Sequence, residues 1–336
     1  MSIVSVTIAA KNEEQNIAKS LSSALNQSYR PIEIFLIDDT STDKTAEVAE
    51  QCYKNYLESK PQSTKSFTIV RNLTNLGFGG SHNAGIRRAQ GNFILCLNAD
   101  CELDKDYVQW AVDIFTRNEA VGAVQGKLIN RKTRKIDTTG LIIFKNRRVI
   151  NRGQGMKDKG QFENEEEIWG VDGAAPVYRR EMLEDIRIED EYFDADFFAY
   201  KEDVDLSWRM RWAGWKCMYQ PKSVAYHDRS AGERITRNPL EIIRERRKIS
   251  EFAKFHSFVN QRLMQIKNET PYLFFKYAPQ ILVKEIMSWS YVLLFEKYGW
   301  KSAWEFFKLL PRIIRKRKYV MAKRRVSDQE MERWLF

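Results

Sequence analysis

Apolar runs and polar stretches alternate along the first third of the chain and predict strands that alternate with helices. In the stretches between the runs, apolar residues return every three or four positions, as at Ile17, Leu21 and Leu25, which predicts helices. This alternation favours an α/β fold with a mostly parallel sheet flanked by helices. The four runs have the length and composition of buried strands and lie at residues 2–10, 33–37, 67–70 and 93–97.

Polar side chains follow the predicted strands, at the sheet edge where open α/β sheets bind ligands. The second run ends in Asp38 and Asp39, and the fourth ends in Asn98 and Asp100. The carboxyl ends of parallel strands share one edge, and a carboxylate there with an oxygen-bearing neighbour suits Mg²⁺ or Mn²⁺. The plain alternative is a solvated acidic turn with helix capping, which needs no ligand.

Glycines precede the third predicted helix, at Gly77, Gly79 and Gly80. They permit close backbone approach, but they form neither a P-loop nor a G-x-G-x-x-G motif, because no glycine follows the first strand. This weakens an ATP or NAD interpretation without excluding other nucleotides.

A second group of acids opens a predicted helix, at Glu202, Asp203 and Asp205. A helix N-terminus favours an ionised carboxylate, whereas neighbouring acids raise one another's pKa. A carboxylate balanced between these effects can serve as a general base toward a hydroxyl group. We predict that Asp203 is this base and that Glu202 either orients it or forms a hydrogen bond with the acceptor. The alternative is an acidic first turn that only stabilises the helix.

The charge of the chain is unevenly placed. The 336 residues carry a net charge of +10, and residues 236–336 hold 22 Lys and Arg against 10 Asp and Glu. Four cysteines form no C-x-x-C pair, and the first residues lack the pattern of a signal peptide. We therefore expect a cytoplasmic protein, with a nearly neutral body and a basic surface-binding region.

The basic region is predicted to be helical over residues 239–256, 272–298, 301–318 and 327–336. Its best apolar run, residues 286–295, is half of the roughly 20 residues that a membrane span requires. Aromatic side chains followed by Lys and Arg clusters fit a helix lying on an anionic membrane. An ordinary helical subdomain with a solvated basic face fits equally well, and we do not expect nucleic acid as the partner.

Four motifs resemble, in order and spacing, the donor half of family 2 glycosyltransferases with the GT-A fold: residues 9–13, 37–43, 75–85 and 97–100. The stretch 191–215 resembles the acceptor-site signature of the same family. Many members have Asp where this chain has Asn98, and the Asn-x-Asp variant resembles the bacterial rhamnosyltransferase-like polysaccharide branch.

The resemblance implies a role for each matching residue. Asp39 would contact the base or ribose of a nucleotide-diphosphate sugar, and Asp100 would hold the metal that bridges the diphosphate. His227 would be the remaining protein ligand of the metal or touch the diphosphate, and Arg229 would neutralise the leaving group. Further donor contacts are expected at Ala9, Ala10, Asn12, Glu13, Gly77, Asn83 and Asn98. Further acceptor or phosphate contacts are expected at Asp172, Gly173, Tyr200, Trp208 and Arg209.

The sequence thus predicts a GT-A domain at residues 1–235, with a donor half (1–106) and an acceptor half (107–235), and a basic amphipathic helical region at 236–336. The expected activity is inverting and metal-dependent transfer from a donor such as dTDP-rhamnose or a UDP-sugar to a glycan or lipid-linked acceptor. Bacterial surface polysaccharide is the expected product, and peripheral attachment at the inner face of the plasma membrane is possible. A sugar-phosphate nucleotidyltransferase and an inert nucleotide-sugar-binding relative are the alternatives.

Overall fold

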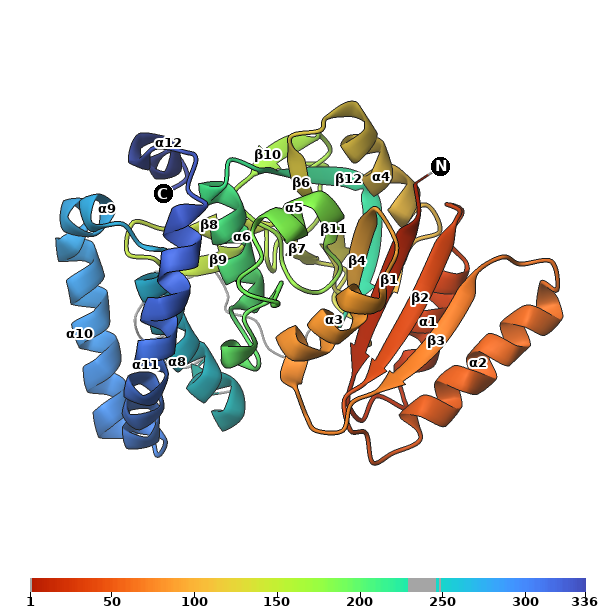
Figure 1. The fold of residues 1–336 in the computed structure, drawn as a ribbon, viewed down its shortest axis with the longest axis horizontal. Helices are drawn as coiled ribbons and strands as arrows, with labels where there is room; N and C mark the ends of the chain where they lie inside the picture. The colour runs from red at the N-terminus through yellow and green to blue at the C-terminus, as the bar shows by residue number, and fades with distance from the viewer. Residues whose placement is uncertain (1, 229–245, 248) are drawn as a thin grey trace.

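A ten-stranded sheet organises the computed structural model, which describes residues 2–228, 246–247 and 249–336 (Figure 1). Its main path runs in the order β10-β12-β6-β11-β4-β1-β2-β3, and the four strands at the β3 end are parallel. These strands and the helices between them are β1 (Val4–Ala10), α1 (Ile17–Leu25), β2 (Ile32–Asp38), α2 (Thr45–Ser59), β3 (Ser66–Arg71), α3 (Gly77–Arg88) and β4 (Phe93–Asn98).

Strand β4 is buried on both faces, as its unbroken apolar run predicts. Phe93, Leu95 and Leu97 pack in the cluster that contains α1, α2 and α4 (Tyr107–Arg117). Ile94 and Cys96 point to the opposite face and pack with α3, α5 (Arg180–Asp185) and α6 (Glu202–Trp212). Alternation along an extended strand thus supplies two separate cores from one five-residue run.

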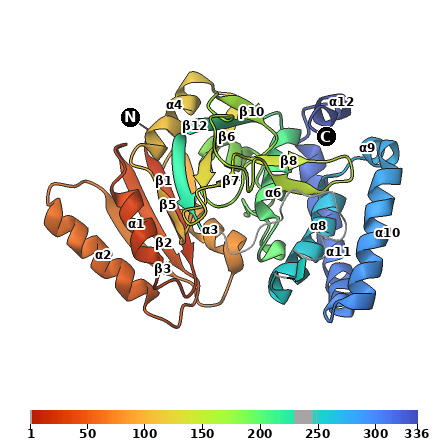
Figure 2. The ribbon, with the colours of Figure 1, turned by 180° about the vertical axis from the view of Figure 1, so that it is seen from behind.

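The second half of the sheet is mixed. Strands β6 (Val121–Ile129) and β12 (Lys216–His227) are parallel neighbours (Figure 2). Strand β11 (Val177–Arg179) lies antiparallel between β4 and β6. The region at 131–159, which has no clear hydrophobic pattern, forms only short strands. The remaining strands are β5 (Cys101–Leu103), β7 (Ile136–Thr138), β8 (Leu141–Ile143), β9 (Val149–Asn151) and β10 (Glu166–Ile168), with a 3₁₀ turn η1 at Ala195–Phe197.

The C-terminal helices pack on the acceptor half and share a hydrophobic core with it (Figure 1). Phe197, Trp208 and Trp212 of the acceptor half lie in one cluster with Leu263 and Ile313 of the C-terminal helices. These helices are α8 (Glu251–Asn268), α9 (Pro271–Lys276), α10 (Ala278–Phe295), α11 (Gly299–Ala322) and α12 (Asp328–Glu332).

The structure changes the boundaries of the expected C-terminal helices, and the helix expected over 327–336 is shortened to α12, which ends at Glu332. The helix expected over 272–298 is divided at Tyr277 into α9 and α10. Of the helix expected over 239–256, residues 239–245 and 248 lie outside the described residues, and α8 begins at Glu251 and continues past the expected end to Asn268. Among the described helices, none has the length and apolar content needed to cross a membrane.

Candidate active site

Three side chains from the ends of different strands meet beside β4. His227 ends β12, and its Nε2 lies 3.3 Å from Oδ1 of Asp100, which follows β4. Its other ring nitrogen, Nδ1, lies 2.9 Å from Oδ2 of Asp137, a buried residue of β7. His227 lies close to Asp100 because β12 pairs with β5 in a register that places His227 opposite Cys101, the residue after Asp100.

The chemistry of these groups fits a divalent cation. A carboxylate and an imidazole are suitable ligands, and a carboxylate on the second ring nitrogen is the usual device that orients a metal-binding histidine. Asp137 therefore favours the tautomer with the proton on Nδ1, which leaves the Nε2 lone pair toward Asp100. Within the described residues, no three His, Cys, Asp or Glu side chains form a metal-binding group.

The predicted catalytic pair opens α6. Asp203 Oδ2 accepts a hydrogen bond from the backbone N–H of Gly173 at 2.9 Å, and Oδ1 accepts from the N–H of Val204 at 2.7 Å. Burial and the nearby carboxylate of Asp172 raise the pKa of Asp203 above its ordinary value. Two backbone donors favour the ionised form and oppose that rise.

The neighbouring Glu202 is in a different environment. Its side chain is buried, and its Oε2 has no hydrogen-bond partner among the described residues. Burial and the charge of Asp203 raise its pKa. Of two adjacent acids, the one with backbone donors keeps its charge more readily, so Asp203 is the better base and Glu202 the better proton holder.

The backbone before this pair is strained. Phe198, Tyr200 and Lys201 have positive φ values of 59°, 68° and 76°, a region that L-residues rarely occupy without support. Part of the support comes from α8, where the side-chain amide of Asn260 lies 2.7–2.8 Å from the carbonyl oxygens of Phe197, Ala199 and Tyr200. We call residues 197–201 the catalytic loop.

A glycine joins the catalytic loop to the donor half. Gly77, at the start of α3, has a φ of +69°, and a Cβ there would lie 2.1 Å from the carbonyl oxygen of Phe198. The next residue, Phe78, donates its N–H to that same oxygen at 2.9 Å. Gly77 therefore has a structural role in this contact, besides the donor contact that the resemblance implies.

The two acid groups lie at one end of β4. The N–H of Asn98 donates to the carbonyl of Ala174 at 2.8 Å, so the segment that carries Asp172 and Gly173 runs beside the end of β4. Burial, and then the nearby carboxylates of Asp100, Asp137 and Asp172, raise the pKa of Cys101. Because Gly173 donates to Asp203, a continuous set of contacts links the catalytic pair to Asp100.

The remaining expected donor contacts frame the same edge. Asp39 is buried and accepts from Asn72 Nδ2 and from the N–H groups of Leu76 and Gly77, at 2.8–2.9 Å. It thereby holds the loop before α3. Asn12 accepts from the N–H of Thr42 at 2.8 Å.

Glu13 faces Asp100 closely enough for the two charges to interact, although burial is the larger cause of its raised pKa. The strand that precedes it, β1, places Ala9 beside Asn98 and Ala10 beside Asp38.

Three side chains that were expected to contact donor or acceptor are buried and have partners within the protein. Asn83 is 2% exposed and uses both ends of its amide on the backbone of Phe193, so it holds the acceptor half and is not available to a donor. Trp208 is 1% exposed and packs against Trp169. Arg209 is 2% exposed and pairs with Asp205 at 2.9 Å.

Two of the remaining expectations meet different outcomes. Tyr200 is 44% exposed at the catalytic loop and stays a candidate acceptor contact. Arg229 lies outside the described residues.

The structure adds residues that the sequence reasoning missed. Asp137 lies in a three-residue strand, too short for a periodic signal. Lys267 of α8 and Lys316 of α11 are buried and form ion pairs with Asp194, which lies just before η1. Their only sequence signal is a polar residue on an otherwise apolar helix face, as with Asn260 in α8.

Comparisons with known proteins show the family of the chain and agree with its fold. The sequence model of glycosyl transferase family 2 matches residues 5–187 of this chain. The poly-beta-1,6-N-acetyl-D-glucosamine synthase of Staphylococcus epidermidis is 26% identical over 230 residues, or 66% of this chain and 49% of that protein. The chain thus spans about half the length of the curated relatives it matches. It belongs to glycosyl transferase family 2.

Solved structures share the fold at low sequence identity. S. aureus TarS 1-349 matches with a TM-score of 0.55 and 16% identity, over 96% of this chain and 89% of that one. The mannosyltransferase PcManGT from Pyrobaculum calidifontis, in complex with GDP-Man and Mn²⁺, matches with a TM-score of 0.52 and 16% identity, over 95% and 85%. The protein therefore has the GT-A fold.

Proposed function

We propose that the protein is an inverting glycosyltransferase that moves a sugar from a nucleoside-diphosphate donor to a glycan or lipid-linked acceptor. The observation that carries the proposal is the pairing of Asp203 with the Gly173 N–H beside the strand end that bears Asp100. The names of the relatives favour the synthesis of a bacterial surface polysaccharide.

In the proposed reaction, Asp203 takes the proton of an acceptor hydroxyl while its oxygen attacks the anomeric carbon. The bond from that carbon to the diphosphate oxygen breaks, and the nucleoside diphosphate leaves with the electron pair. One displacement with one base inverts the anomeric configuration. The backbone donors at Gly173 and Val204 hold the carboxylate in place, and the high pKa of Glu202 keeps a proton next to it.

On the donor side, Asp100 and His227 are the proposed ligands of Mg²⁺ or Mn²⁺, with Asp137 fixing the imidazole. The cation would offset the charge that builds up on the departing diphosphate. The base and ribose would lie against Ala9, Asn12 and Asp39. Because TarS 1-349 is solved in complex with UDP, we include UDP-sugars beside dTDP-rhamnose as candidate donors.

Product analysis tests the proposal. We expect the purified protein to release a nucleoside diphosphate from its donor, with a sugar product of inverted configuration by NMR. Release of pyrophosphate from a nucleoside triphosphate and a sugar 1-phosphate would identify a sugar-phosphate nucleotidyltransferase instead. Thermal stabilisation by a nucleotide sugar, without turnover of any donor and acceptor tried, would identify an inert binder. A panel of UDP-, GDP- and dTDP-sugars with and without Mn²⁺, and of the matching nucleoside triphosphates with sugar 1-phosphates, covers these outcomes.

A further inference from the structure

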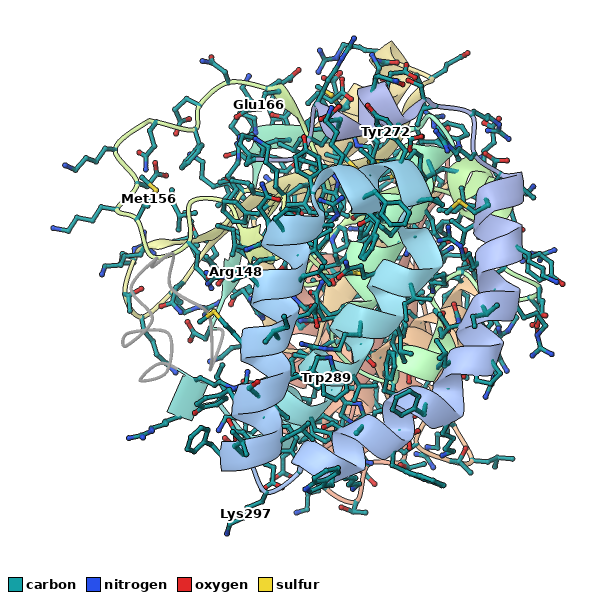
Figure 3. The ribbon with its side chains drawn as sticks, turned by 90° about the vertical axis from the view of Figure 1, so that its left-hand side faces the viewer. Arg148, Met156, Glu166, Tyr272, Trp289 and Lys297 are labelled. Carbon is teal, nitrogen blue, oxygen red and sulfur yellow. The ribbon has the colours of Figure 1, made fainter. Side chains whose placement is uncertain are left out.

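The helices α10 and α11 present large apolar side chains to solvent on one side of the molecule. Figure 3 looks onto this side, where α10 lies in front and runs down to Lys297. The side chains are each 60–75% exposed, far above what a packed helix leaves uncovered. We call them the α10–α11 apolar face, which comprises Ile286, Met287, Leu294, Phe295, Trp300 and Trp304.

The exposed side of α10 carries no charge. Its two charged residues, Lys284 and Glu285, are both partly buried and pair with each other at 2.7 Å. Helix positions 283, 286, 290 and 294 share one side of a helix, and the sequence places only Ser290 among apolar residues there. A contiguous exposed apolar surface of this kind marks an interaction site on a water-soluble fold.

The exposed charged side chains beside the apolar face are all positive. The exposed charged residues of α11 are all basic, whereas its single acid, Glu305, is partly buried and lies 3.3 Å from Lys308. Trp300 and Trp304 stand at the start of this helix, and indole rings favour the boundary between lipid and water. The exposed basic residues are Lys301, Lys308, Arg312, Arg315 and Lys318.

We infer that the α10–α11 apolar face binds the surface of an anionic lipid bilayer. Apolar side chains would enter the boundary of the acyl chains while the neighbouring lysines and arginines meet acidic headgroups. A second copy of the chain fits less well, because a symmetric contact through α11 would bring two basic rows together. The inference rests on the proposed function, because membrane binding would bring the enzyme to a lipid-linked acceptor.

Vesicle binding of the full chain tests the inference without donor or acceptor. We expect sedimentation with vesicles of phosphatidylcholine and phosphatidylglycerol, weaker binding to phosphatidylcholine alone, and loss at raised salt. The triple variant Leu294→Gln, Phe295→Gln and Trp304→Gln should bind roughly tenfold or more weakly, because it removes buried apolar area at the membrane. Met156→Gln removes an exposed apolar side chain that belongs to neither α10 nor α11, and this variant should bind as the wild type does.

Brominated lipids identify the contact directly. They should quench the fluorescence of the wild type on phosphatidylglycerol vesicles, and much of this quenching should disappear in the double variant Trp300→Phe and Trp304→Phe. Absence of wild-type vesicle binding, or equal binding by the triple variant, would overturn the inference. An oligomer that the triple variant converts to monomers, with no vesicle binding, would also overturn it and identify a self-contact.

The result is separable from the proposed function. Nucleoside diphosphate release in the absence of lipid reports on the active site alone. If this release occurs without vesicle binding, only the membrane inference fails. If vesicles bind but no donor is turned over, only the proposed function fails.

Discussion

The side-chain amide of Asn260 lies 2.8 Å from the carbonyl oxygen of Tyr200, and this contact joins the C-terminal helices to the catalytic loop. The same amide reaches the carbonyls of Phe197 and Ala199. A helix outside the region matched by the family description thus supports strained backbone just before the catalytic pair. The C-terminal helices therefore contribute to the geometry of the proposed active site.

Asn260→Ala should reduce the rate of transfer more than the binding of donor. The variant leaves the loop carbonyls without their donor, so the strained loop can relax and move Asp203. We expect kcat to fall roughly tenfold to a hundredfold, because small displacements of a catalytic group have effects of this size. The KM for the nucleotide sugar should stay within about threefold, since Asn260 touches none of the proposed donor contacts.

Gln261→Ala is the matched control for that variant. Gln261 is the next residue of α8, is similarly buried, and donates to the carbonyl oxygen of Arg147 at 2.8 Å, away from the catalytic loop. Both variants should lower the free energy of unfolding by about 1–3 kcal/mol. Equal losses of kcat in the two would show that Asn260 acts only through overall stability.

Asp203→Asn should abolish transfer and spare donor binding. The amide cannot take a proton, although its oxygen can still accept from the Gly173 N–H. We expect a rate loss of about 10²- to 10⁴-fold, with the dissociation constant of the nucleoside diphosphate changed by a few-fold at most in calorimetry. A parallel loss of binding would assign Asp203 to the donor site.

Asp172→Asn should shift the pH dependence of transfer toward lower pH. The base must be ionised, so the rate falls as pH drops through the pKa of Asp203, which burial and then Asp172 hold above the ordinary value. Removing the Asp172 charge lowers that pKa and moves the fall in kcat/KM to lower pH, by roughly half a pH unit to one unit. Asp113→Asn, at a surface pair with Arg117, should leave the profile in place.

Helices and strands could be predicted from the sequence where a single feature, such as an apolar run or a group of acids, determines the local structure. The run at 93–97 can only be a strand buried on both faces, and α6 begins at Glu202, where the acids favour a helix start. The interpretation of Trp208 as a sugar contact failed for a tertiary reason. Helix α6 is covered on two sides, by the sheet and by the C-terminal helices.

Contacts between residues far apart in the chain could not be predicted from the sequence. Asp137 comes close to His227 because β7 pairs with β6, and β6 in turn pairs with β12. Asn260 and Lys267 lie beyond the expected end of the helix at residue 256, and they are buried because α8 continues to Asn268 and packs against the acceptor half. No spacing along the chain relates these residues to the catalytic loop.

Lys267→Met should destabilise the protein strongly. Lys267 is fully buried, forms an ion pair with Asp194, and lies 2.9 Å from Asp205. Removing one partner leaves uncompensated buried charge, which costs about 3–5 kcal/mol, as urea denaturation at pH 7 would measure. Lys308→Met, at an exposed pair with Glu305, should change the free energy of unfolding by less than about 0.5 kcal/mol.

The decrease in the free energy of unfolding caused by Lys267→Met should depend on pH. Burial alone would raise the pKa of Asp194, but the charges of Lys267 and Lys316 outweigh it and hold that pKa well below its usual range. A depressed pKa stabilises the fold above the unfolded-state value and loses this effect as pH falls through the folded-state value. The difference between wild type and variant should therefore shrink below about pH 4. A constant difference would show that packing, not charge, dominates.

Asp137→Asn should weaken the binding of Mn²⁺ while leaving the fold intact. Asp137 is not a proposed ligand, but its carboxylate receives the Nδ1 proton of His227 and so directs Nε2 toward Asp100. An amide can present its NH₂ group to Nδ1, which would favour the other tautomer and place the proton on Nε2. Loss of such a supporting carboxylate typically lowers metal affinity by about 10- to 100-fold.

Mn²⁺ binding in the presence of a nucleoside diphosphate, followed by electron paramagnetic resonance, measures this effect apart from turnover. Asp158→Asn is the control, because Asp158 pairs with Lys127 at 3.1 Å and has no contact with the histidine. Unchanged Mn²⁺ affinity in Asp137→Asn, with His227→Ala abolishing binding, would show that the imidazole is held by the fold alone. Unchanged affinity in both variants would remove His227 from the metal site and leave Asp100 with the donor diphosphate as the proposed ligands.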